Sequence, residues 1–198
     1  SGCVSLTDVK IPDTVTIIGA WVFADCFSLE SISIPKSVTK ITHNAFSRCN
    51  SLSKIEVSYK NAKYDSRENC NAIIETANNR LIIGCQNTII PNSVTAIGRA
   101  AFVDCNGMQE LYIPSSVTNF NNSYESIFEG CTGKLYIDCN IPSSRYDWDD
   151  DDNLIFGAVF ERALGADVQT LGKYLDKDYV FTDFSVDLSA NTDSYYNE

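Results

Sequence analysis

The sequence has few of the features that catalysis, nucleic-acid binding or membrane insertion requires. It contains one histidine among 198 residues, and no apolar run approaches the roughly 18–20 residues of a membrane helix. Only 15 lysines and arginines stand against 26 aspartates and glutamates, which gives a formal net charge of −11. Nucleic acids and anionic membranes attract clusters of basic residues, and no such cluster is present. We therefore expect no nucleic-acid partner and no membrane insertion.

Motifs of catalytic sites are missing as well. The sequence has no G-x-S-x-G motif, no P-loop and no dinucleotide-binding fingerprint. A Ser-His-Asp or Cys-His site would have to use His43, which stands between Ile41 and Ala45 in an expected exposed loop. Two of the acidic residues could converge as a carboxylate pair, but acids on a regular repeat surface rarely form a desolvated pocket. We expect a protein that is not an enzyme and needs no cofactor.

A repeat of 23 residues organises most of the chain. Ile11-Pro12 recurs as Ile34-Pro35, and Ile90-Pro91 recurs as Ile113-Pro114, each after 23 residues. AFSRC at 45–49 returns as AFVDC at 101–105. A period of 20–29 residues is typical of a solenoid whose units are stable only when stacked.

The pattern within one repeat predicts how a coil is built. In Leu29-x-x-Ile32-x-Ile34 the isoleucines alternate with polar residues, as in a short strand with one buried face. Pro35 ends this strand, since it has no N–H to donate. The following Ala45-Phe46 is expected on a short helical or 3₁₀ turn. Phenylalanines at this position should stack as one core ladder, namely Phe23, Phe46, Phe102 and Phe128.

The string L-x-x-I-x-I-P-x-S-V-T-x-I-x-x-x-A-F-x-x-C resembles the BspA-type leucine-rich repeat of bacterial and some protist surface proteins. The resemblance covers Cys3 to about Ile137. It implies parallel short strands, secretion or display on a cell surface, and frequently adhesion to host proteins. It implies no catalytic residues. The sequence starts within a repeat and not with methionine, so we expect a processed form or a piece of a longer protein.

Two segments depart from the repeat. AIIET and RLIIG, at 72–76 and 80–84, flank an Asn-Asn pair and predict a β-hairpin insert at the edge of the solenoid. Residues 164–172 echo the repeat once more, and Val180 to Leu188 alternate as a capping strand would. We therefore expect one leucine-rich-repeat unit over 1–188, with regular repeats at 1–57 and 89–137, the insert at 58–88, a degenerate repeat with an acidic loop at 138–175, a C-terminal cap at 176–188, and a polar tail at 189–198.

The cysteines are expected to be largely reduced. Five of the eight share one repeat position and should point inward in parallel, which does not suit a disulfide; they are Cys3, Cys26, Cys49, Cys105 and Cys131. Cys70 and Cys85 flank the hairpin, and a disulfide between them is the alternative to two free thiols. No C-x₂₋₄-C pair exists for zinc.

An acidic run is the one candidate for a metal site. Asp149, Asp151 and Asp152 supply oxygen ligands of the kind that calcium prefers. Their spacing does not match an EF-hand loop, and consecutive acids usually form a solvated loop. Calcium binding there is a weak candidate, and we expect no resident metal.

A surface strip is the candidate binding site. The residue between the two isoleucines of each strand should face outward, and strands about 4.8 Å apart would align these side chains in one continuous strip. Its members are Lys10, Ser33, Glu56, Tyr112 and Tyr136. Exposed tyrosines favour interfaces, but cross-strand aromatic pairs also stabilise sheets without any ligand.

The repeat pattern and the resemblance together predict an extracellular or cell-surface module. Its expected role is adhesin-like binding of a protein, for example from host extracellular matrix or serum. The alternative is a passive structural spacer in a larger surface protein. Neither the identity of the partner nor the oligomeric state follows from the sequence.

Overall fold

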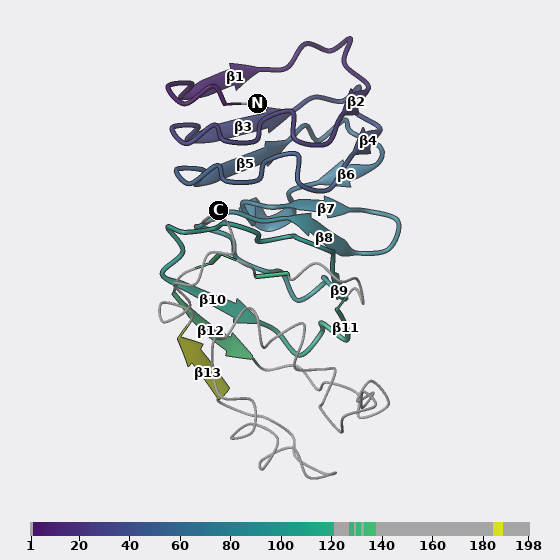
Figure 1. Ribbon diagram of the computed structural model, residues 1–198. Helices are drawn as coiled ribbons and strands as arrows, with labels where there is room; N and C mark the ends of the chain where they lie inside the picture. The colour runs from purple at the N-terminus through teal and green to yellow at the C-terminus, as the bar shows by residue number, and fades with distance from the viewer. Residues whose placement is uncertain (1, 121–126, 129, 132, 138–183, 188–198) are drawn as a thin grey trace, which may run out of the picture.

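The computed structural model describes residues 2–120, 127–128, 130–131, 133–137 and 184–187. Successive coils lie one below the other, with the N-terminal coil at the top of Figure 1. The degenerate repeat at 138–175, the acidic loop within it and the tail at 189–198 lie outside the described residues. Of the cap at 176–188, the described part is Phe184–Asp187.

The Ile-x-Ile motifs form one column of short strands. β1 (Asp8–Lys10), β3 (Ser31–Ile34) and β5 (Lys54–Val57) pair in parallel, with Val9 opposite Ile32 and Ile32 opposite Ile55. A second sheet joins β10 (Glu110–Ile113) in parallel to β12 (Lys134–Ile137), and β13 (Phe184–Asp187) pairs antiparallel to β12. Parallel strands at the repeat spacing are therefore confirmed, and β13 lies within the range of the predicted cap.

A second column of strands follows on the return path of each coil. β2 (Ile17–Ile18) and β4 (Lys40–Ile41) pair in parallel as a separate two-stranded sheet. A five-stranded sheet has the order β11 (Asn119–Phe120), β9 (Ala96–Ile97), β8 (Arg80–Ile83), β7 (Ile73–Glu75) and β6 (Tyr64–Asp65). In Figure 1 this column lies on the right, opposite β1, β3 and β5.

The hairpin prediction is confirmed. β7 and β8 pair antiparallel, with Glu75 opposite Arg80 and a register shift between Ile73 and Ile74. Asn79 in the turn has φ 51°, a left-handed conformation that asparagine adopts more readily than most residues. On its other side β8 pairs in parallel with β9, so the hairpin takes the place of a strand within the stack.

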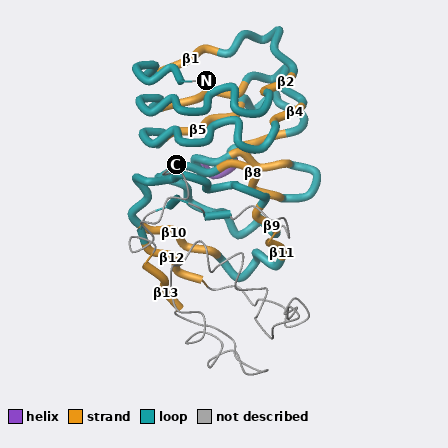
Figure 2. The backbone as a smooth tube through the Cα atoms, in the orientation of Figure 1, coloured by secondary structure: helices purple, strands orange, loops and turns teal. Residues whose placement is uncertain are grey.

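The prediction of a short helical turn at Ala45-Phe46 is wrong. The helix within the described residues is the 3₁₀ segment η1 (Arg67–Asn69) of the insert, and the coils in Figure 2 are otherwise strands and turns. The turn that carries the core phenylalanine in each of three coils is flanked by two residues with positive φ, a conformation that ends a right-handed helix. These pairs recur four residues apart, at Trp21 and Asp25, Asn44 and Arg48, and Ala100 and Asp104.

The predicted phenylalanine ladder is broken in the middle. Phe23 stacks on Phe46 with ring centroids 5.2 Å apart, and Phe102 stacks on Phe128 at 5.5 Å. Between the two pairs lies Gly84, whose N–H donates to the Ala101 carbonyl at 2.7 Å. The N–H of Phe23 donates to Ala45 in the same way at 2.9 Å. Gly84 thus takes the place of a phenylalanine, and the core divides into two clusters at this level.

Most of the cysteine ladder lies as predicted. Cys26, Cys49 and Cys131 are buried, and Cys105 is half-buried, but Cys3 is exposed and does not point into the core. The first coil has a neighbour on one side only within the described stack, which explains this difference. The thiol of Cys49 donates to the Phe23 carbonyl at 3.1 Å, and that of Cys131 to Phe102 at 2.7 Å. These two thiols each link a coil to the one before it.

Cys70 and Cys85 are free thiols in the structure. Cys70 donates to the Ala72 carbonyl at 3.8 Å, and Cys85 donates to Asn71 at 3.2 Å. Burial raises the pKa of each thiol to about 11, and it raises the pKa of Cys49 to about 12. Thiols with such pKa values are protonated at neutral pH and react slowly.

Replacing Gly84 by alanine should destabilise the chain. A Cβ atom at Gly84 would overlap the Phe102 ring, so we expect a loss of about 1–3 kcal/mol in the free energy of unfolding. Gly19→Ala is the matched control, because no atom lies within 4 Å of a Cβ built there. Urea titration measures both variants. The double variant Gly84→Ala/Phe102→Leu should lose less unfolding free energy than the two single variants lose together. A loss equal to that sum would contradict the proposed contact.

The buried thiols should resist alkylation in the folded chain. With iodoacetamide at about pH 8, we expect Cys3 to react well before Cys49, Cys70 and Cys85, as mass spectrometry of the peptides would show. Burial favours the protonated thiol, so its contribution to stability is complete below the ordinary pKa of 9.0 and declines as the pH rises from there toward about 12. Unfolding free energies that did not fall between about pH 8 and pH 10.5 would contradict these shifts.

Candidate functional site

The first part of the predicted strip lies on β1, β3 and β5. The backbone register places Lys10 opposite Ser33 and Ser33 opposite Glu56, and all three side chains are exposed. Lys54 forms an ion pair with Glu56, with Nζ and Oε1 2.8 Å apart. Both of these side chains are more than half exposed, so the pair adds at most about 1 kcal/mol. The strip here is polar and exposed.

The second part of the strip lies on β10 and β12. Tyr112 and Tyr136 are directly paired in the parallel register, and Tyr112 is 52% exposed. The side chain of Tyr136 is not among those that the structure describes. The predicted continuity of the strip is wrong, because β5 and β10 belong to separate sheets with the insert between them. The arrangement is two short patches.

A groove at the insert is a further candidate that sequence reasoning missed. It has a volume of about 260 Å³ and lies between the loop after β4, the hairpin and the loop after β9. Its charged and titratable lining residues are Lys40, His43, Glu75, Arg80 and Arg99. His43 is exposed, as expected, and now borders this groove. His43 and Arg99 occupy equivalent repeat positions, but Glu75 and Arg80 belong to the insert, so repeat position alone does not group the lining residues.

The groove follows from the way β4 ends its sheet. β4 pairs with β2 on one side, and on the other the Ile41 N–H donates to the Tyr64 hydroxyl at 3.0 Å. A side chain thus satisfies an N–H that a neighbouring strand would otherwise bind. The five-stranded sheet begins beyond it, and the space between the two sheets is left open.

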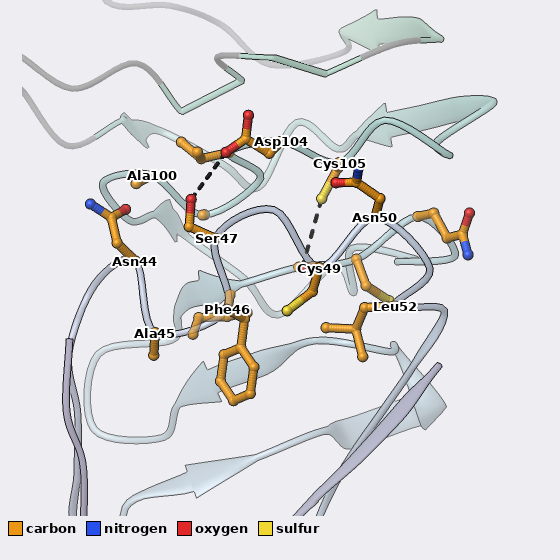
Figure 3. Close-up of a pocket in the computed structure, with 16 residues that line it drawn as sticks. Asn44, Ala45, Phe46, Ser47, Cys49, Asn50, Leu52, Ala100, Asp104 and Cys105 are labelled. Atoms are coloured by element: carbon orange, nitrogen blue, oxygen red, sulfur yellow. Dashed lines mark hydrogen bonds between the residues drawn. The ribbon is translucent and has the colours of Figure 1, made fainter. Parts of the chain in front are cut away.

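A small cavity lies between the turns at 44–50 and 100–105 (Figure 3). Its volume is about 30 Å³, enough for one or two water molecules. Ser47 crosses it and donates to Asp104 Oδ2 at 3.0 Å, while burial raises the pKa of the Asp104 carboxyl. The side-chain oxygens of Asn44 and Asn50 are buried without a hydrogen bond from the described residues. Bound water would satisfy them, so this cavity is structural.

The described residues form no metal-binding cluster, and the thiols near the small cavity are protonated. The thiols near this cavity are buried and have raised pKa values, as with Cys49 and Cys85. Among residues 2–120 and the shorter described segments, no three metal-binding side chains converge. The calcium candidates Asp149, Asp151 and Asp152 lie outside the described residues. No helix in the described part of the chain has the length and apolarity needed to cross a membrane.

Solved structures of bacterial proteins resemble this chain at modest levels. A leucine-rich repeat protein from Eubacterium ventriosum is 24% identical, with a TM-score of 0.49, covering 68% of this chain and 42% of that one. A leucine rich cell surface protein from Faecalibacterium prausnitzii is 25% identical, with a TM-score of 0.45, covering 67% and 42%. The pneumococcal vaccine antigen PcpA is 15% identical, with a TM-score of 0.40, covering 67% and 51%.

The chain thus spans less than half the length of the first two of these structures. A search of curated proteins found no significant match. The model of the BspA type leucine-rich repeat region matches residues 1–82 and 80–147, with six copies of the repeat. These copies include the Ile-x-Ile strands and the Ala-Phe turns described above. The chain therefore belongs to the BspA type leucine-rich repeat family.

Proposed function

We propose that the chain is a non-catalytic module, exported and displayed at a cell surface, that binds another protein through the strip of Lys10, Ser33, Glu56, Tyr112 and Tyr136. The observation that carries the proposal is the parallel register, which aligns one side chain per coil on an outer face. Stacked repeats commonly offer such extended surfaces to partners. Membership of the family supports the proposed surface display and the choice of a host matrix or serum protein as partner.

Tyr112 is the strongest single anchor within the strip. About half of its side chain is exposed, and the register places Tyr136 directly beside it. A tyrosine contributes a large contact area and a hydroxyl while losing little side-chain entropy on binding. Residues that carry most of the energy of an interface are enriched in this type. We therefore expect the patch on β10 and β12 to matter more for affinity than the polar patch on β1, β3 and β5.

A passive spacer is the second candidate function. The stacked coils, with buried isoleucines in successive strands, would hold another domain at a distance without contacting any ligand. In that case the paired tyrosines would only stabilise the sheet. The two functions differ in one respect that can be measured, namely whether a partner exists.

Truncating the tyrosine patch should weaken binding without unfolding the chain. The chain would first be screened by surface plasmon resonance against purified extracellular-matrix and serum proteins. For any saturable partner, Tyr112→Ala should weaken binding about tenfold or more, and Tyr112→Ala/Tyr136→Ala further, since a loss of about 1.4 kcal/mol is a factor of ten. Tyr59→Ala is the matched control, because Tyr59 is 89% exposed and lies outside the strip.

The controls separate binding from folding. Circular dichroism should show the same unfolding midpoint for Tyr59→Ala as for the unmodified chain, and a midpoint within a few degrees for Tyr112→Ala. Equal affinity of the Tyr112 and Tyr59 variants would remove the strip from the interface. Absence of any saturable partner in the panel would favour the spacer.

A further inference from the structure

The groove at the insert has a charge opposite to that of the chain as a whole. Residues 2–120 contain ten acidic and ten basic residues, so the whole excess of negative charge follows residue 120. Within this balanced part, the groove is lined by three permanently basic side chains and one acid, Glu75. A local excess of positive charge beside an otherwise neutral surface attracts anionic groups.

The carboxylate of Glu75 does not compensate the charge of Lys40 or Arg99, because it is already paired with Arg80. Its Oε2 atom accepts from Arg80 Nε at 3.0 Å and from an Arg80 terminal nitrogen at 2.7 Å, and from Asn78 at 3.0 Å. The Arg80–Glu75 pair is only about one-third exposed, so water screens it incompletely. The basic side chains of the lining outside this pair are Lys40 and Arg99.

Lys40 is the residue best placed to bind a ligand. It lies on β4 beside the Ile41–Tyr64 hydrogen bond that ends the sheet, and its side chain is exposed. Lys36, Arg48 and other basic residues of the described segments form ion pairs with nearby acids, but Lys40 forms none with a described residue. Its ammonium group is available to a partner.

The groove combines this charge with an apolar lining. Ile41 and Ile82 are half-buried, Ile83 is buried, and all three line the groove. Its volume of about 260 Å³ lies just below the range of sites for drug-sized molecules and suits one or two side chains of a peptide. The basic groups of the groove are complementary to an acidic side chain, and its aliphatic lining is complementary to apolar side chains on either side of that acid.

We propose that this groove binds an acidic peptide segment of a partner protein, with its carboxylate on Lys40 and its aliphatic neighbours on Ile41 and Ile82. The site is distinct from the strip: it lies beside β4, β8 and β9, whereas the strip lies on the other column of strands. It gives the chain a second and independent contact. Two weak contacts on one partner raise its overall affinity well above that of either.

The test uses the full chain and a defined peptide. A fluorescent pentapeptide of alternating glutamate and leucine, with blocked ends, is titrated by anisotropy, and a glutamine–leucine peptide is its uncharged counterpart. We expect saturable binding of the glutamate peptide and at least tenfold weaker binding of the glutamine peptide. Raising the salt concentration should weaken the former, because screening reduces the attraction.

Charge reversal in the chain locates the site. Lys40→Glu should weaken binding of the glutamate peptide about tenfold or more. Lys60→Glu makes the same change in net charge at an exposed residue outside the groove, and should change binding by less than about twofold. Lys40→Met removes the charge and largely keeps the length of the side chain, and its affinity for the glutamate peptide should lie between those of the other two variants. Unfolding midpoints of all three variants confirm that they fold.

Several outcomes would overturn the proposal. Equal affinity for the glutamate and glutamine peptides would show that the groove does not recognise the negative charge. Equal weakening by Lys40→Glu and Lys60→Glu would assign the effect to the overall field of the chain. Sedimentation that revealed self-association, lost in Lys40→Glu, would assign the groove to the acidic C-terminal part of a second copy instead of a different protein.

Discussion

A coil of 23 residues cannot bury its isoleucines by itself; it buries them only against the next coil. Stacking therefore has to satisfy several conditions at one spacing: Ile32 must meet Ile55, Phe23 must meet Phe46, and the Phe23 N–H must reach the Ala45 carbonyl. The Cys49 thiol fits the same register, because it donates to the previous coil. Any side chain at an outward position is aligned as a consequence, whether or not it binds a partner.

The insert relaxes this constraint at one level, and several irregular features of the molecule follow from it. The hairpin supplies β8 as a neighbour for β9, but it brings Gly84 where a phenylalanine would stand. The aromatic stack is consequently split, and the small cavity around Ser47 and Asp104 opens between the turns on either side. Beside β4 the sheets also separate and leave the groove. Interrupting the stack makes the core less uniform, and it also creates a concave surface.

The sequence predicted what depends on repetition and missed what depends on its interruption. Alternating isoleucines specified the strands, and two β-prone runs around Asn78-Asn79 specified the hairpin. Nothing in the repeat indicated that Gly84 would separate Phe46 from Phe102, because Gly84 has no counterpart in other coils. The non-helical form of the phenylalanine turns was also beyond prediction, because Trp21 and Ala100 adopt positive φ, which neither residue type favours.

The same distinction explains why the two candidate sites differ in how far sequence could locate them. Members of the strip share one repeat position, so their alignment follows from counting residues, as with Lys10 and Ser33. Lining residues of the groove come from β4, the hairpin and the loop after β9, which only the interrupted stack brings together. A regular surface is easily predicted but nearly flat, and flat polar surfaces hold a ligand through many weak contacts. The groove at the insert can orient a single charged group, which favours the insert as the place where we propose that specificity is set.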